Sequence, residues 1–233
     1  MSPHALEELW PPYALRVEAG DLTLSVLRER DVPELVALVL EGIHDPGTMP
    51  FLYPWTAAPP EDVPANYVRY LGRVLAGQGP GAMSLQLVVR RAGETVGIQA
   101  LEGEEVSTTR TVETGSWLVR REHGKGIGTR MRRAACALAF DHLGIERITS
   151  AAYLDNPASL AVSRAVGYQD NGRAWVARQG ESAEQQRFVL TPETFRRGEP
   201  IRVEGAAAVR AFYGLDRAAA TPVPAGSGTH VRS

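Results

Sequence analysis

The sequence predicts a single α/β (α+β) domain within its 233 residues. Short stretches in which apolar and polar residues alternate indicate half-buried strands, and other stretches repeat apolar residues every three or four positions, as on one helix face. A glycine-rich loop, Arg121 to Thr129, joins a predicted strand to a predicted helix. A chain of this length buries about 70 to 75% of its unfolded surface, so a stable core is expected.

The first 60 residues predict a strand, a helix and a loop. Residues 22–26 alternate apolar and polar side chains, which predicts a strand. Asp31, followed by Pro33 and Glu34, is typical of a capped helix start. The segment 47–60 contains four prolines and three aromatic residues, so we expect a loop that presents aromatic side chains, namely Phe51, Tyr53 and Trp55.

The next 60 residues predict a helix followed by three strands. Residues 84–91 and 94–101, joined at Ala92-Gly93, read as an antiparallel hairpin. A polar link at 104–111 precedes a strand at 112–119. The helix before the hairpin is indicated by apolar residues on one face, Val63, Tyr67, Leu71, Val74 and Leu75.

The loop after the 112–119 strand is suited to an anion. Its alternate glycines allow the backbone to turn with N–H groups pointing inward, without side chains in the way, namely Gly124, Gly126 and Gly128. A helix follows at once and ends near Gly144. Its N-terminal dipole favours negative charge by about 0.3 to 1 kcal/mol at an exposed site. A plain strand-to-helix turn is the alternative.

Two nucleotide-binding motifs do not fit this loop. The dinucleotide fingerprint G-x-G-x-x-G requires a glycine at Thr129 or at Met131, depending on where it starts. The P-loop requires a glycine at Val119 and a serine or threonine at Gly126. Both patterns therefore fail.

The pattern Arg121-x-x-Gly124-x-Gly126 instead resembles the R/Q-x-x-G-x-G/A loop of Gcn5-related N-acetyltransferases. Downstream, residues 145–153 resemble the family's next strand, Asn156-Pro157 opens a helix with a capping asparagine, and Gly167-Tyr168 resembles its G-F/Y ending. Residues 113–118 (ETGSWL) resemble the E-x-G-x-W-L strand of the RimJ/RimL branch. The resemblance implies a mixed, largely antiparallel sheet that is splayed at the 112–119 strand, with helices on both faces.

The same resemblance implies an acyl-CoA site and no metal. Backbone N–H groups of the loop would bind the CoA pyrophosphate, with charge from its basic residues, and the end of the preceding strand would pair with the pantetheine arm. Asn156 would bind that arm or the acyl group, unless it is only a helix cap. The implied cofactor-binding residues are Leu118, Val119, Arg121, Gly124, Lys125, Gly126, Ile127, Gly128, Thr129, Arg130 and Asn156.

The implied reaction is direct attack of a primary amine on the thioester of acetyl-CoA. We expect Glu113 to be the base, because in an alternating strand it shares a face with Gly115 and Trp117. Glu102 is the second candidate, and Glu113 could instead be a solvated acid. The tyrosine that many members carry seven residues after the asparagine is replaced by Ser163, so Ser159 and Ser163 are weak candidates for the acid, and the assignment stays open.

Composition limits the partners and the location. A net charge of −2 with scattered arginines argues against nucleic acid, and a single cysteine, Cys136, excludes an internal disulfide or a thiolate metal site. No stretch of about 18 apolar residues and no secretory signal is visible, so we expect no membrane partner and a cytoplasmic location.

The domain organisation and three questions of function follow from the same reading. We expect an N-terminal extension at 1–14, the N-acetyltransferase domain at 15–215, and a disordered tail at 216–233 that is rich in proline, glycine and serine. The acceptor is either a protein N-terminus or a small amine. A transferase for a larger acyl group such as succinyl, or a non-catalytic CoA-binding module, are the rival functions. The oligomeric state is open, a homodimer being one option.

Overall fold

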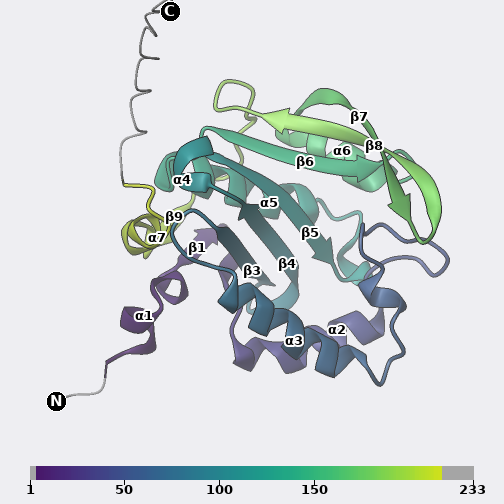
Figure 1. Cartoon of the computed structure of the whole chain (residues 1–233), viewed down its shortest axis with the longest axis horizontal. Coiled ribbons are helices and arrows are strands. Elements are labelled where there is room, and N and C mark those ends of the chain that lie inside the picture. The colour runs from purple at the N-terminus through teal and green to yellow at the C-terminus, as the bar shows by residue number, and fades with distance from the viewer. Residues whose placement is uncertain (1–3, 217–233) are drawn as a thin grey trace, which may run out of the picture.

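The computed structural model describes residues 4–216, and its centre is one nine-stranded mixed sheet (Figure 1). The order across the sheet is β7-β8-β6-β5-β4-β3-β2-β1-β9, and β5–β6 is the one parallel pair in this sheet. The strands are β1 (Arg16–Ala19), β2 (Leu22–Val26), β3 (Met83–Arg91), β4 (Glu94–Gly103), β5 (Thr111–Leu118), β6 (Arg147–Tyr153), β7 (Gln169–Arg178), β8 (Glu181–Leu190) and β9 (Arg202–Glu204).

Helices cover both faces of this sheet, as predicted. The α2 and α3 helices pack on one face, and α5 and α6 pack on the other (Figure 1). The helices are α1 (Leu6–Leu9), α2 (Val32–Glu41), α3 (Val63–Ala76), α4 (Val106–Thr109), α5 (Ile127–Ala137), α6 (Pro157–Val166) and α7 (Ala206–Phe212), with 3-10 turns at Pro11–Ala14, Glu29–Asp31, Trp55–Ala57 and Arg120–Glu122 and a π turn at Leu138–His142. None of the helices in residues 4–216 is long and apolar enough to cross a membrane.

Two apolar clusters follow from this arrangement. Leu35 of α2 and Tyr67 of α3 pack against Ile98 of β4, and all three are buried. On the other face, Met131 of α5 and Ile148 of β6 belong to the larger cluster. The apolar faces that the sequence predicted for these strands and helices therefore do face the core.

Local details depart from the sequence reading in two places. Asp31 stands at the start of α2 but makes no cap bond to that helix, because its carboxylate accepts from the Arg28 backbone N–H (2.9 Å) and from Arg90 Nη2 (2.7 Å). The predicted polar link contains α4, whose Val106 is fully buried. A tertiary contact replaces the expected cap, and a buried side chain anchors the expected link.

The first described residues pack against the last ones. The ring of Trp10, which follows α1, lies 5.0 Å from the ring of Phe212 in α7, with an edge-to-face tilt. β1 pairs with β9, so the strands from the two ends of the described chain are neighbours. The predicted tail lies outside the described residues, apart from Asp216.

Candidate active site

The neighbouring strands β5 and β6 separate in the middle of the sheet. β5 pairs with β4 along almost its whole length, from Glu113 to Leu118. Its pairing with β6 covers only residues 111–113 and stops at Glu113 opposite Thr149. Beyond that point β5 and β6 diverge, which confirms the splay predicted for this strand. An extended ligand can add hydrogen bonds to a strand edge that is left open in this way.

The glycine loop lies at the end of the open strand and leads into α5. Gly124 and Gly126 have φ angles of +73° and +78°, which non-glycine residues rarely adopt, and Gly126 directly precedes the first helical residue, Ile127. A Cβ atom at either glycine would meet nothing within 4 Å. Glycine is therefore needed here for backbone conformation. The first N–H groups of α5, including those of Gly128 and Thr129, lack partners within the helix, and such groups can donate hydrogen bonds to an anion.

Acidic neighbours hold the basic side chains of this loop. Lys125 Nζ lies 3.2 Å from Glu122 Oε1, and Arg121 pairs with Glu41. Burial pushes the pKa of Glu122 upward, but Lys125 and Arg91 together hold it below its ordinary value. The charge of Lys125 is therefore balanced in this structure.

Two carboxylates from outside the glycine loop hold Arg130. It pairs with Glu199 (2.6 Å) and with Asp21 (2.5 Å), at the turn between β1 and β2. Hydrogen bonds from Arg130 and from Arg91 lower the pKa of Asp21 below its ordinary value. Two carboxylates satisfy this guanidinium, so its role at the pyrophosphate requires that it leave them.

Leu118 and Val119 are buried, so they can meet a ligand only through their backbone. The Leu118 carbonyl accepts from His123 Nε2 (2.8 Å), and the Val119 N–H donates to the Val96 carbonyl (2.9 Å). Both groups are already used. The open stretch of β5 is therefore centred on residues 114–117.

Two glutamates face each other beside the splay. Glu113 and Glu102 are direct partners across β5 and β4, so their side chains share the α2–α3 face. Glu102 Oε1 accepts from Gln86 Nε2 (2.7 Å) and from Ser84 Oγ (3.1 Å). The Glu113 side chain reaches solvent, yet loss of water around it raises its pKa, Arg187 opposes the rise, and the charge of Glu102 adds to it.

Asn156 caps α6 as predicted. Its Oδ1 accepts from the backbone N–H of Ser159 (3.1 Å), and this bond leaves the side-chain NH₂ group able to donate elsewhere. Ser159 is half-buried. Ser163 has no exposed surface, and its Oγ has no hydrogen-bond partner among residues 4–216. A side chain without accessible surface cannot touch a ligand in this conformation, which argues against Ser163 as the acid.

The sequence did not predict a polar network that lies beneath the splay. Arg132 of α5 is only 4% exposed, and it donates to Ser116 of β5 and to Ser150 of β6. Beside it, Thr114 Oγ1 and the Tyr168 hydroxyl are 2.8 Å apart. Ser116 stands at a variable position of the E-x-G-x-W-L strand, and Arg132 stands beside an apolar helix face, so neither had a signal in the sequence.

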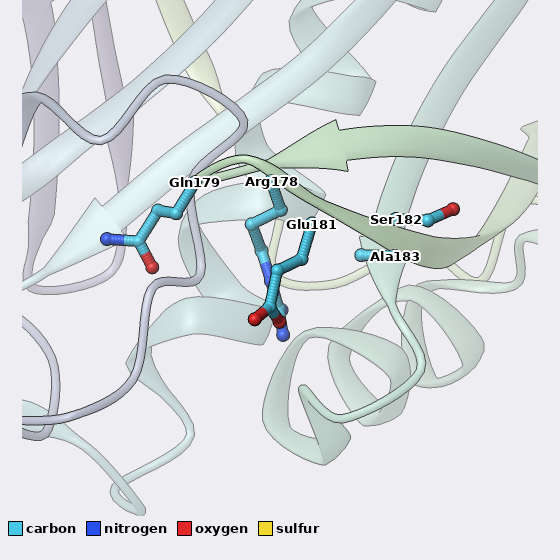
Figure 2. Close-up of a pocket in the computed structure, with 5 residues that line it drawn as sticks. All are labelled: Arg178, Gln179, Glu181, Ser182 and Ala183. Carbon is cyan, nitrogen blue, oxygen red and sulfur yellow. The ribbon is translucent and has the colours of Figure 1, made fainter.

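A hollow of about 280 Å³ lies at the turn between β7 and β8 (Figure 2). The side chains of Arg178 and Glu181 lie beside each other below the hairpin, and that of Gln179 extends away from them, to the left of the view. Arg178 makes a bidentate ion pair with Asp155, at the end of β6 (2.6 and 2.9 Å). The hollow is built from one hairpin only, and it includes none of the predicted site residues.

Within residues 4–216, no cluster of three or more histidine, cysteine, aspartate or glutamate side chains is arranged to hold a metal ion. Cys136 lies in the core, and burial raises the pKa of its thiol to about 11.

Comparison with known proteins identifies the family. The chain is similar to the "Putative ribosomal N-acetyltransferase YdaF" of Bacillus subtilis (strain 168), with 34% identity over 65 residues, which are 28% of this chain and 36% of that relative. The match thus spans about a third of the relative.

Solved structures agree on the fold. RimJ of Mycobacterium smegmatis in complex with CoA-disulfide has a TM-score of 0.60 and 20% identity, over 84% of this chain and 91% of that chain. The spermidine N-acetyltransferase of Vibrio cholerae in complex with CoA and spermine has a TM-score of 0.59 and 17% identity, over 75% and 97%. The sequence profile of the Acetyltransferase (GNAT) domain matches residues 21–169, which is more than half of the chain. The chain therefore belongs to the GNAT acetyltransferase family.

Proposed function

We propose that this protein transfers an acetyl group from acetyl-CoA to a primary amine. The observation that carries the proposal is the open edge of β5 beyond Glu113, which leads directly into the glycine loop and the start of α5. One extended ligand with a pyrophosphate at one end fits such a strand and loop, because the strand edge offers backbone hydrogen bonds and the helix start offers N–H groups and a favourable dipole.

Donor binding then rests mainly on the backbone. The pantetheine arm would pair with β5 over residues 114–117, and the pyrophosphate would lie against residues 124–129. Lys125 would exchange its contact with Glu122 for a phosphate oxygen, since a compact ammonium binds phosphate as a point charge. The NH₂ group of Asn156 would contact the arm or the acyl group.

The chemistry needs a neutral amine close to the thioester. An α-amino group of pKa about 8 loses its proton at pH 7 for about 1.4 kcal/mol, whereas a lysine side chain of pKa about 10.4 needs nearly 5 kcal/mol. We assign the base to Glu113, acting directly or through one water, because its raised pKa improves it as a proton acceptor. Glu102, anchored by Gln86 and Ser84, has the supporting role of raising that pKa.

The acceptor would approach from the α2–α3 face, which carries both glutamates. Trp117 of β5 lies on that face, 6.4 Å from the ring of Trp55, and Trp55 lies 5.2 Å from Phe51. Aromatic and acidic groups together suit an amine-bearing acceptor. A protein N-terminus and a small amine both meet this description. The names of two solved relatives correspond to these two kinds of acceptor: a RimL ribosomal L7/L12 alpha-N-protein acetyltransferase and a spermidine N-acetyltransferase.

The test has two stages. In the first, CoA should raise the melting temperature in proportion to the logarithm of its concentration, and pantetheine, which lacks the pyrophosphate, should do far less. A shift with NAD or ATP but none with millimolar CoA would overturn the donor assignment.

In the second stage, thiol release is followed with acetyl-CoA and succinyl-CoA against a panel of N-terminal peptides and polyamines, and products are identified by mass spectrometry. An acetylated amine supports the proposal. CoA binding without thiol release from any pair would leave the protein as a non-catalytic CoA-binding module.

A further inference from the structure

A buried arginine joins the two strands of the splay. Arg132 Nη2 donates to Ser116 Oγ of β5 (2.9 Å), and its Nη1 donates to Ser150 Oγ of β6 (3.3 Å). Ser116 lies three residues beyond Glu113, where the pairing of the two strands ends. The guanidinium therefore spans the gap from the α5 side.

The positive charge of Arg132 has no anionic partner in the described part of the chain. Its contacts are serine hydroxyls, and its Nε is buried without a hydrogen bond. Around it lie the Tyr168 hydroxyl and the Cys136 thiol, 3.7 Å apart and both neutral groups in ordinary conditions. A buried cation is stabilised by a nearby negative charge, so this site favours an anion in the splay.

Ser116 can connect the buried charge of Arg132 to a ligand by a hydrogen bond. Its oxygen accepts from Arg132, so its own hydrogen is free to be donated, and among residues 4–216 no acceptor takes it. Ser116 is half-buried on the open stretch of β5. Ser150, by contrast, is buried, and its Oγ lies 3.5 Å from the Thr114 carbonyl.

We propose that Ser116, oriented by Arg132, donates a hydrogen bond to the sulfur of CoA as it leaves. This inference rests on the proposed function. The amine nitrogen attacks the thioester carbon, the C–N bond forms, and the C–S bond breaks with its electron pair passing to sulfur. The ammonium proton goes to Glu113 or its water. Ser116 keeps its proton and stabilises the thiolate, and Arg132 is the positioning residue.

With Ser116 as a hydrogen-bond donor to the leaving thiolate, the proposed step needs no separate general acid. Ser163 has no accessible surface. Tyr168 is only 3% exposed, and its hydroxyl lies 2.8 Å from Thr114 Oγ1. A CoA thiol with a pKa near 8.5 does not require full protonation to leave, so one well-placed donor beside a buried cation is sufficient.

The first test measures the thiol of bound CoA by ultraviolet difference titration of the thiolate. With the wild-type protein saturated with CoA, we expect a thiol pKa about one unit below that of free CoA, as a nearby cation and a hydrogen bond both favour the thiolate. The variants Ser116→Ala and Arg132→Gln should bring it back towards about 8.5. The protein's own thiol, Cys136, titrates only near 11 and does not interfere.

The second test is kinetic. Ser116→Ala should lower kcat about 10- to 100-fold, the range for losing a hydrogen bond to a charged group, and should change KM for acetyl-CoA less than about threefold. Ser25→Ala is the matched control, because Ser25 also accepts from an arginine, Arg90 (3.2 Å), but lies on β2, three strands from β5. It should keep the wild-type kcat.

Two results would overturn the inference: an unchanged kcat in Ser116→Ala, or a bound-thiol pKa equal to that of free CoA in the wild type. If Arg132→Gln does not fold, Ser116→Ala carries both tests alone. Failure of CoA to bind the wild-type protein at all would instead count against the proposed function, so the two failures are distinguishable.

Discussion

Glu102 and Glu113 lie directly opposite each other on β4 and β5, and only one of them is anchored. Glu102 is held by Gln86 and Ser84, whereas the pKa of Glu113 is raised chiefly by loss of water and lowered by the charge of Arg187. The charge of Glu102 disfavours ionisation of Glu113 and adds to the rise in the pKa of Glu113 that loss of water causes. Loss of water and the neighbouring charge together raise the pKa of Glu113 above its ordinary value, which suits a proton acceptor.

Glu113→Gln should therefore lower kcat/KM at neutral pH and recover much of it at higher pH, where the amine deprotonates unaided. In the wild type, activity should fall as the pH drops through the pKa of Glu113, which lies above its ordinary value. A pH profile of kcat/KM measures both effects. Identical profiles for the variant and the wild type would move the base to Glu102 or to water alone.

The neighbours of Glu113 should move its pKa in opposite directions. Arg187→Ala removes the charge that lowers this pKa, so the acidic limb of the profile should shift to higher pH. Glu102→Gln removes the like charge, so the limb should shift to lower pH. Shifts in the same direction would show that the limb belongs to another group.

Ionised Glu113 should destabilise the folded protein, whereas an ionised acid in a salt bridge stabilises it. A carboxyl with a raised pKa in the folded state binds its proton more tightly than in the unfolded state, so it costs stability above that pKa. Glu113→Gln should raise the melting temperature at neutral pH, and the gain should vanish below the pKa of an unfolded glutamate. Thermal melts across the pH range would check this.

Gly126→Ala tests the conformation of the glycine loop. A non-glycine residue at φ +78° costs about 1 to 2 kcal/mol, and relaxation of the loop to relieve it would misplace the first N–H groups of α5. We expect weaker CoA binding in calorimetry. Gly180→Ala is the matched control, because Gly180 also has a positive φ (+86°) and open space but lies in the β7–β8 turn. It should lose similar stability and keep its CoA affinity, and an equal loss of affinity in both variants would contradict the assignment.

Lys125 is the single lysine of the chain, so its role can be read from a chemical label. Amine-selective labelling should modify Lys125 and the N-terminal amine. Saturating CoA should slow the labelling of Lys125 and leave the labelling of the N-terminal amine unchanged, which serves as an internal control. Lys125→Ala should weaken CoA binding by about 1 to 3 kcal/mol without changing acceptor preference. Labelling of Lys125 at the same rate with and without CoA would mean that the ammonium stays with Glu122.

Gly97→Ala tests how closely β4 and β5 must approach at the entrance to the loop. A Cβ at Gly97 would lie 2.2 Å from the Trp117 carbonyl oxygen, which is backbone and cannot swing aside. Overpacking of this kind costs about 1 to 3 kcal/mol, so we expect a lower denaturation midpoint and weaker donor binding together. Unchanged urea denaturation would contradict this reading of the strand contact.

Much of the fold and of the candidate donor site could be predicted from short stretches of the sequence. Alternation and helical spacing predicted the strands around Glu113 and the helix faces, since both follow from which side chains share one face. The glycine loop and the Asn156 cap were predictable for the same reason: a positive φ and a capping bond are decided within a few residues. The approximate end of β5 and the start of α5 therefore came from the sequence alone.

The tertiary structure decided which of these groups can act. Arg130 was expected at the pyrophosphate, but it pairs with Glu199, 69 residues away, and Ser163 lost all exposed surface to helix packing. The pairing of Glu102 with Glu113, and the position of Arg132 beneath the splay, depend on strand register and helix orientation. A shift of one residue in register moves every side chain of a strand to the other face, and only the packed sheet fixes that register.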